Sequence, residues 1–286
     1  MSSHRKLFLL ILATMLFLAS LPSAAGEIRP ELFNARALAL GGAVRAIPST
    51  VMAARMNPAA LSPIRGFYGG FSYEGQDRDV GGFDAVQVTL VDNATSNFAG
   101  AIQYTRSTSD YQLEDLGISI AGGKSNHFGA TLRYIHGRDS NLDSWESALV
   151  GDLGFLAERH GGLKIAVTGH DLFADQLGFL SPRIALGLAY PIFPRWNLST
   201  DFVRHTEESM SDGQDYHVGL EWTPSGSSFA LRFGQMWEGL TDEDATSIGF
   251  GWKSEEGWVF GYAVQKVRQI SGFDNLRHCF SVQAAM

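Results

Sequence analysis

Bulky apolar residues alternate with small or polar residues along most of the chain after residue 66. In "DYHVGLEW", residues 215–222, every second side chain is large and apolar, and the residues between are small or polar. The same period recurs in "SFALRFGQMW", "TSIGFGW", "GWVFGYAV" and "PRIALGLAY". A period of two places the two sets on opposite faces of a β-strand, so this part of the chain is predicted to be all-β.

The pattern divides into about fourteen predicted strands. They cover residues 66–74, 82–91, 97–106, 113–121, 127–136, 145–156, 162–170, 183–190, 196–204, 215–222, 229–237, 245–253, 257–266 and 276–284. An even number of antiparallel strands is typical of bacterial single-chain membrane barrels. No domain boundary stands out within residues 66–286, so we expect one continuous sheet.

Alternation alone fits two environments. In a soluble sandwich the bulky face would be the core, whereas in a membrane barrel it would meet lipid. The predicted connections are alternately longer, as in "DLFADQLGFLSP", and tight, as in "PSGS", and aromatic residues such as Trp145, Trp196 and Trp222 gather near predicted strand ends. Unequal loops and aromatic girdles favour the antiparallel transmembrane barrel.

The first 25 residues resemble an export signal. Arg5 and Lys6 precede the apolar run "LFLLILATMLFL", and small residues at Ser23 and Ala25 predict cleavage after Ala25. The run is shorter than the roughly 20 residues of a spanning helix, although an uncleaved membrane helix is the alternative. No later stretch holds 18 consecutive apolar residues, so a mature chain that spans a membrane must do so with strands.

Charge and side-chain chemistry exclude several functions. The formal charge of −8 becomes −10 when Arg5 and Lys6 are removed, and an acidic protein is poorly suited to bind nucleic acid. With Cys279 as the single cysteine, there is no internal disulfide or cysteine metal site. The eight histidines show no metal-binding spacing, and "GISIAGGKS" matches neither a phosphate loop nor a nucleophile elbow. We therefore predict no catalytic site, no metal, no cofactor and no enzyme activity; a membrane hydrolase using serine and histidine is the least favoured alternative.

Residues 34–64, "NARALALGGAVRAIPSTVMAARMNPAALSPI", precede the strands and carry a family resemblance. Ala35-Arg36, Gly41-Gly42-Ala43 and "NPAAL" at 57–61 look like the start of mature FadL-like and PorV/PorQ-like outer-membrane proteins. The later stretches "LKIAVTGHDL", "SPRIALGLAYPIFPRWNLSTDF" and "FALRFG…TSIGFGW…VFGYAV" resemble the same group in the same order. The resemblance extends over nearly the whole mature chain.

The resemblance implies a fourteen-stranded barrel closed by an N-terminal plug, or hatch. It divides the chain into a signal peptide at 1–25, a plug at 26–65 and a barrel at 66–286, and carries the plug motif onto one set of residues: Arg36, Gly41, Gly42, Asn57, Pro58 and Ala59. In FadL-like proteins the implied function is uptake of small hydrophobic molecules. In the PorV/PorQ group it is a secretion-associated or surface-attachment role without transport. The implied location is the bacterial outer membrane, with lipid, the barrel-assembly machinery, and a hydrophobic ligand or a secretion-system protein as partners.

Two departures from the family pattern are visible. The chain lacks the long outer loops of typical fatty-acid transporters, which argues against fatty acids as cargo. It also ends "FSVQAAM" without a terminal aromatic residue, so either Phe280 serves as the insertion signal or the reading frame carries an extra tail.

Polar residues on the small-residue faces are predicted to point into the barrel lumen: Arg133, Asp201, Glu221, Arg232 and Arg277. Acidic residues in the predicted longer connections are expected to face water, where they would contact a partner or, through divalent ions, lipopolysaccharide: Asp77, Asp79, Asp139, Asp143, Glu207, Glu208, Asp212, Asp242, Glu243 and Asp244.

The stretch "RMNPAALSPI", residues 55–64, fits neither a regular helix nor a strand. Pro58 and Pro63 lack the N–H groups that a strand ladder needs. Its small residues would let a compact backbone sit inside a lumen faced with glycine and alanine, with the Asn57 amide bonding to buried backbone groups. We expect this stretch to be plug rather than wall, the alternative being a linker into the first strand.

Overall fold

The computed structural model describes residues 34–77, 84–108, 111–139, 145–173, 180–206, 213–239, 243–269 and 274–285. The described residues form fourteen strands: β1 (Gly66–Asp77), β2 (Asp84–Asn93), β3 (Ala99–Thr108), β4 (Tyr111–Gly123), β5 (Asn126–Asp139), β6 (Glu146–Glu158), β7 (Lys164–Leu172), β8 (Arg183–Phe193), β9 (Trp196–His205), β10 (Gln214–Trp222), β11 (Phe229–Glu238), β12 (Glu243–Lys253), β13 (Trp258–Gln269) and β14 (Asp274–Ala285). The predicted all-β class and strand count are confirmed.

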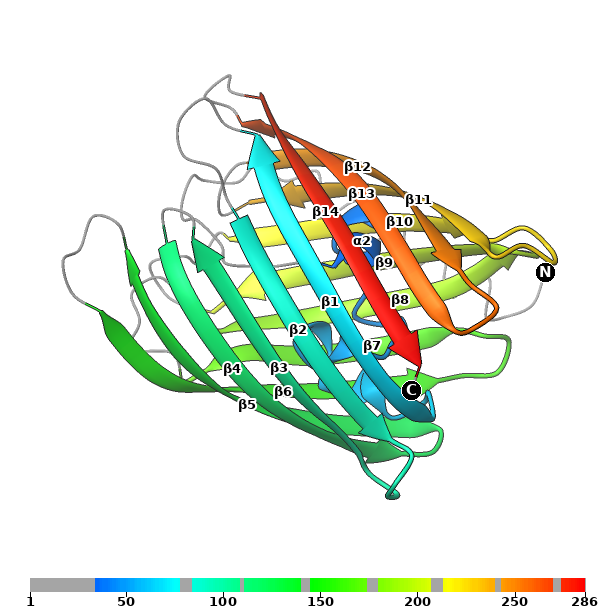
Figure 1. Cartoon of the computed structure of the whole chain (residues 1–286), viewed down its shortest axis with the longest axis horizontal. Coiled ribbons are helices and arrows are strands. Elements are labelled where there is room, and N and C mark those ends of the chain that lie inside the picture. The colour runs from blue at the N-terminus through cyan, green and yellow to red at the C-terminus, as the bar shows by residue number, and fades with distance from the viewer. Residues whose placement is uncertain are drawn as a thin grey trace.

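Each strand pairs antiparallel with its neighbours in sequence, and β14 pairs with β1 to close the barrel (Figure 1). The closing register aligns Tyr68 with Ala285 and Tyr73 with Phe280. β14 therefore continues five residues beyond Phe280, and residues 281–285 belong to the wall. Closure leaves no unpaired sheet edge, which a strand-based membrane protein requires.

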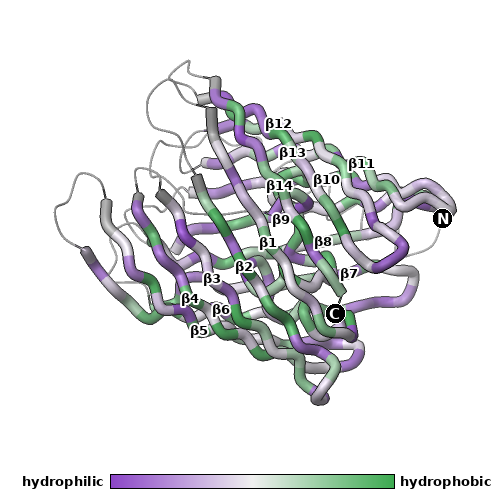
Figure 2. The backbone as a smooth tube through the Cα atoms, in the orientation of Figure 1, coloured by the Kyte–Doolittle hydropathy of each residue, from purple (hydrophilic) through white to green (hydrophobic). Residues whose placement is uncertain are grey.

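The barrel turns its apolar face outward. Leu132 is 60% exposed whereas the adjacent Arg133 is 1% exposed, and Ile118 and Leu149 are also 60% exposed. Figure 2 shows the resulting mixture of hydrophobic and hydrophilic positions along each strand. At one end of the barrel, Trp196 stacks on Trp222 with ring centroids 5.8 Å apart. An apolar outer face with aromatic rings near its edge is that of a membrane barrel, not of a soluble sandwich.

The alternation of loop lengths is weaker than predicted. The connection between β3 and β4, on the side expected to carry the longer loops, spans only residues 109–110. β1 runs to Asp77 and β5 to Asp139, so residues expected in loops extend the strands instead. The predicted signal peptide and its cleavage point lie outside the described residues. No helix in the described ranges is long and apolar enough to span a membrane.

Leu220 provides a test of the two faces. It lies on β10 between Gly219, which faces the plug, and Glu221, which bonds to the plug, so alternation directs Leu220 to lipid. Leu220→Arg is expected to destabilise the assembled barrel by about 2–4 kcal/mol. Heat-modifiable gel mobility of the membrane fraction measures the assembled share. Leu220→Met is the control, and equal assembly of both variants would contradict the assignment of faces.

Candidate functional site: the plug and its charged anchors

Residues 34–65, called the plug segment below, begin with a short capped helix. α2 (Ala35–Ala39) starts where the Asn34 side chain accepts a hydrogen bond of 2.9 Å from the Ala37 N–H. It ends at Gly41 and Gly42, whose φ angles of 60° and 82° are readily adopted by glycine. The Gly42 N–H donates to the Ala37 carbonyl at 2.9 Å, which satisfies the helix end. The paired glycines of the predicted motif thus turn the chain inside the lumen.

The second half of the plug segment holds α3 (Ala53–Met56) and the 3₁₀ helix η1 (Pro58–Leu61). Asn57 caps η1 by accepting a 3.0 Å hydrogen bond from the Ala59 N–H, and Pro58 takes the first helical position. The Asn57 amide also donates to the Arg45 carbonyl at 2.8 Å. "RMNPAALSPI" is therefore a helix end followed by a capped 3₁₀ turn, and it lies inside the barrel.

The two ends of the plug segment contact opposite parts of the wall. α2 packs against β11 to β14, and η1 packs against β4 to β6. The helices are visible inside the barrel in Figure 1. Buried alanine and leucine side chains such as Leu38, Leu40 and Leu61 fill the contacts. The plug segment therefore spans the lumen.

Glycines in the wall let the plug backbone approach closely. A Cβ built on Gly234 of β11 would lie 2.1 Å from the Gly41 nitrogen, and one built on Gly154 of β6 would lie 2.2 Å from Asn57 Oδ1. A Cβ on Gly129 of β5 would lie 2.4 Å from the Pro58 carbonyl carbon. No real side chain fits at these separations. The expectation that small wall residues accommodate the plug is confirmed at both of its ends.

Three arginines of the described plug segment bind carboxylates of the wall. Arg36 makes two hydrogen bonds to Glu221 on β10, at 3.0 and 2.8 Å. Arg45 Nη1 lies 3.3 Å from Asp201 on β9, which also accepts the Val44 and Arg45 backbone N–H groups. Arg55 bonds to Asp115 on β4 at 2.5 Å. Because buried ion pairs are costly to break, these contacts fix the plug segment in one position.

Arg133 is the centre of a buried charged cluster. It donates to Asp115 at 2.8 Å, to Asp152 at 2.9 Å and to Asp171, so its guanidinium joins carboxylates of β4, β6 and β7. Arg183 of β8 binds the other oxygen of Asp171 at 3.0 Å. The charges continue from strand to strand around one side of the plug. Each carboxylate is paired with at least one cation, as low-dielectric surroundings require.

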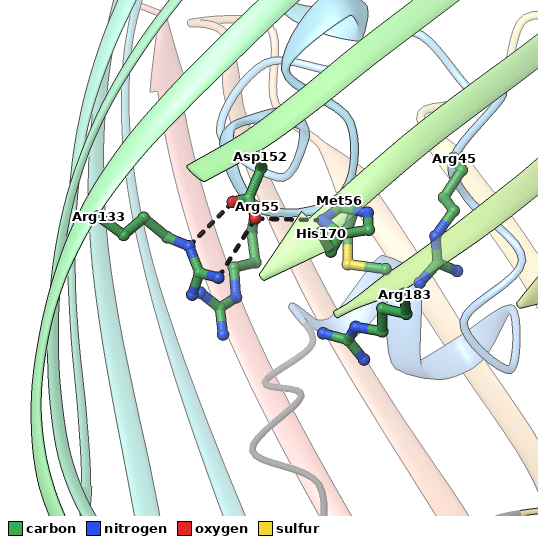
Figure 3. A pocket seen from close by; sticks show the side chains of 7 residues that line it. All are labelled: Arg45, Arg55, Met56, Arg133, Asp152, His170 and Arg183. Carbon is green, nitrogen blue, oxygen red and sulfur yellow. Dashed lines mark hydrogen bonds and ion pairs between the residues drawn. The ribbon is translucent and has the colours of Figure 1, made fainter. Parts of the chain in front are cut away.

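A void of about 10 Å³ lies inside this cluster, with room for one water molecule. Figure 3 shows its lining: Arg45, Arg55, Met56, Arg133, Asp152, His170 and Arg183. A shift of register between β6 and β7, at Gly151/Leu153, shapes the site. Asp171 has φ 54° there, and His170 and Asp171 are both buried beside Asp152. Strict alternation would have put these two neighbours on opposite faces.

The predicted lumen-facing residues lie inside the barrel but in different roles. Asp201 and Glu221 anchor the plug, and Arg232 shares Glu221 at 2.7 Å. Arg277 lies apart, with long contacts of 3.4 and 3.5 Å to Gln265 and Glu243. Sequence reasoning missed the remaining charged partners: Arg45, Arg55, Asp115, Asp152, Asp171 and Arg183. Asp115 sits at an inward position of its strand pattern, a signal that alternation does carry.

Two apolar patches face the lumen between the plug and the end with the longer connections. The first combines residues of β4, β5 and β6 with one residue before β8: Leu113, Ile135, Ala148, Val150 and Leu180. The second joins β11, β12 and β13: Met236, Ala245 and Val267. Lumen walls of water-filled pores are polar, whereas these side chains are apolar and at most 6% exposed.

A Ser–His–Asp group joins the residues just before β8 to β9 and β10 near the same end. Ser181 Oγ lies 2.8 Å from His205 Nδ1, and His205 Nε2 lies 3.4 Å from Asp215 Oδ2. A serine nucleophile is activated through Nε2, with the carboxylate on Nδ1, so the contacts here are reversed. The group is best described as a polar link between strands.

The acidic residues expected to face partners are mostly beyond the described part of the chain. Asp79, Asp143, Glu207, Glu208, Asp212 and Asp242 are outside it, and the side chains of Asp77 and Asp139 are too. Glu243 is wrong as a partner-facing residue, because it is 7% exposed and contacts Arg277. Among the residues described, no group of three histidine, cysteine or acidic side chains is arranged to hold a metal ion.

Solved structures of other barrels resemble this fold, among them the following three. The chain is similar to the CymD monoaromatic hydrocarbon channel, with a TM-score of 0.74 and 12% identity over 89% of this chain and 97% of that one. The TodX deltaS2S3 mutant monoaromatic hydrocarbon channel gives 0.71 and 12% over 91% and 100%. The Pseudomonas putida toluene transporter TodX gives 0.63 and 11% over 91% and 99%. No protein-family model and no curated protein matches the chain. At these identities the likeness establishes the barrel fold alone.

Asn57→Ala tests the internal order of the plug segment. The side chain is 1% exposed and satisfies both the Ala59 N–H and the Arg45 carbonyl. Its loss leaves buried backbone groups unpaired, so we expect the free energy of unfolding to fall by about 1–3 kcal/mol. Denaturant unfolding of refolded protein measures this change. Asn126→Ala, which removes an exposed hydrogen bond to Arg159, should change the value by less than about 0.5 kcal/mol.

Proposed function

We propose that this protein is a bacterial outer-membrane barrel that conducts small hydrophobic molecules past its N-terminal plug. The observation that carries the proposal is the arrangement of the lumen, in which apolar patches lie on one side of a plug that charged residues and glycine contacts hold in place. A hydrophobic solute would gain contact with the patches once the groups that now cover them move, whereas ions and polar solutes would meet a lumen filled by the plug.

The ligand class is supported by the fold likeness. The similar structures are described as a monoaromatic hydrocarbon channel and a toluene transporter, so a compact aromatic molecule is the first ligand to test. We place the short connections on the periplasmic side, as in other outer-membrane barrels. Signal cleavage after Ala25 and insertion by the barrel-assembly machinery belong to the same proposal.

Passage requires the plug to move or loosen, because its two ends contact opposite walls. Residues Arg36, Gly41, Gly42, Asn57, Pro58 and Ala59 would act by positioning the plug rather than by touching the solute. α2 is the proposed mobile part. Its Ala35 Cβ lies 3.1 Å from a Cβ built on Gly261 of β13, close to the separation of about 3.5–4.5 Å in a disulfide.

A reversible lock tests the proposal directly. Cells that carry the double variant Ala35→Cys/Gly261→Cys in a Cys279→Ser background are compared for uptake of labelled toluene before and after oxidation. Oxidation should lower uptake, and a reductant should restore it. The single variant Ala35→Cys in the same background controls for the oxidant. Unchanged uptake after deletion of the whole protein would overturn the conduit and leave the secretion-associated role as the remaining candidate.

A further inference from the structure

A cavity of about 390 Å³ lies between the plug and the wall at the end with the short connections. Its lining comes from the start, middle and end of the plug segment and from β1 and β11 to β14. In Figure 1 α2 lies behind β14, and it packs against β11 to β14. The volume is within the range of small-molecule sites.

The charges around this cavity do not balance. Arg36, Arg232 and Lys253 line it, and the carboxylate that contacts these arginines is Glu221. Glu221 accepts hydrogen bonds from Nε and Nη2 of Arg36 at 3.0 and 2.8 Å and from Nε of Arg232 at 2.7 Å. Arg36 and Arg232 thus share the carboxylate of Glu221, and Lys253 adds a third positive charge to the lining. The local excess of positive charge would attract an anion.

Arg232 presents unused donors. It is 7% exposed, and its terminal nitrogens make no hydrogen bond to another described residue. Gly251 gives the guanidinium its space, since a Cβ at that position would lie 2.6 Å from Nη1 and 2.9 Å from Nη2. The two terminal nitrogens form one planar edge, which matches a carboxylate or phosphate oxygen pair.

Another part of the lining is apolar. Val51 and Ile64 of the plug segment, Tyr68 of β1 and Val259 of β13 contribute to it. A ligand that fits both parts has an anionic head and a compact hydrocarbon body. We propose that this cavity binds such an amphipathic organic anion, with its acid group on Arg232, Lys253 and Arg36. The proposal that the cavity binds this ligand depends on the geometry alone. The further idea that a transported molecule occupies this cavity just before it leaves the barrel rests on the proposed conduit function.

Benzoate is the probe that tests the site. Titration calorimetry of the folded protein in non-ionic detergent should show saturable binding, weakened about tenfold by Arg232→Gln and by Lys253→Gln. Lys164→Gln is the matched control, because Lys164 begins β7 at the same end of the barrel and is not part of the cavity lining. Neutral benzamide should bind at least about tenfold more weakly than benzoate.

Competition experiments with benzoate distinguish the possible anions: a small organic acid, inorganic phosphate or a lipid headgroup. Inorganic phosphate should compete poorly because it has no apolar body, and equal competition would overturn the assignment of an organic ligand. Release of phosphatidylglycerol from membrane-purified protein by benzoate would support the site and identify a lipid headgroup as its natural occupant.

Absence of benzoate binding, or equal binding by wild type, Arg232→Gln and Lys253→Gln, would overturn the proposal. Lys253 is exposed at a strand end, so its variant is expected to fold even if Arg232→Gln does not. Toluene uptake is measured separately, so failure of the conduit and failure of this site give different results.

Discussion

Arg133→Met is expected to lower the free energy of unfolding by about 3–5 kcal/mol, because it leaves buried carboxylates without their shared cation. Arg133 is 1% exposed and binds Asp115, Asp152 and Asp171 from three different strands. Arg55 and Arg183 would remain near two of these groups. Among the described residues, the ion pair left to Asp152 would be the contact with His170 at 3.7 Å. Denaturant unfolding followed by the heat-modifiable gel shift measures the loss.

Arg277→Met is the matched control for this prediction. Arg277 is also an arginine of the lumen, but its side chain is 20% exposed and its contacts are 3.4 and 3.5 Å long. Weak, partly solvated pairs contribute little, so this variant should change stability by less than about 1 kcal/mol. A similar fall in the free energy of unfolding in the two variants would show that the cluster around Arg133 stabilises the protein no more than the partly exposed contacts of Arg277 do.

Gly234→Val is expected to unseat one end of the plug while the barrel still assembles. The added Cβ would lie 2.1 Å from the Gly41 nitrogen and 2.4 Å from the Leu40 carbonyl carbon, and neither backbone atom can yield as a side-chain tip could. The plug segment must shift, and its contact with β11 is lost. Influx of a chromogenic polar substrate into intact cells should therefore rise severalfold above wild type.

Gly100→Val separates this effect from a general cost of replacing glycine in a strand. A Cβ on Gly100 would meet nothing nearer than the Ser119 carbonyl oxygen at 4.0 Å, so the wall tolerates it. Influx should stay at the wild-type level. An assembled Gly234→Val barrel that admits no more substrate than Gly100→Val would contradict the view that this contact seals the lumen.

Strand number, wall orientation and the presence of a plug could be predicted because they depend on local patterns. Alternation of bulky and small residues assigns each position to lipid or lumen, as Leu132 and Arg133 illustrate. The glycine pair and the "NPA" turn mark Gly41, Gly42, Asn57 and Pro58 as special backbone positions. Backbone propensity and helix capping act within a few residues, so these features can be predicted from the sequence without knowledge of the fold.

Tertiary structure alone decided which charges meet and where the ligand-sized cavity lies. Arg36 and Glu221 are separated by 185 residues, and Arg45 and Asp201 by 156, so no local pattern joins them. The register shift beside Asp152 buries both His170 and Asp171. Strict alternation, which correctly assigned the faces of other positions, would have placed one of these two neighbours on the outer face. These arrangements follow from barrel closure, which brings distant strands around one plug at fixed register. The sequence by itself determined the wall and its lining; the closed barrel determined the anchors.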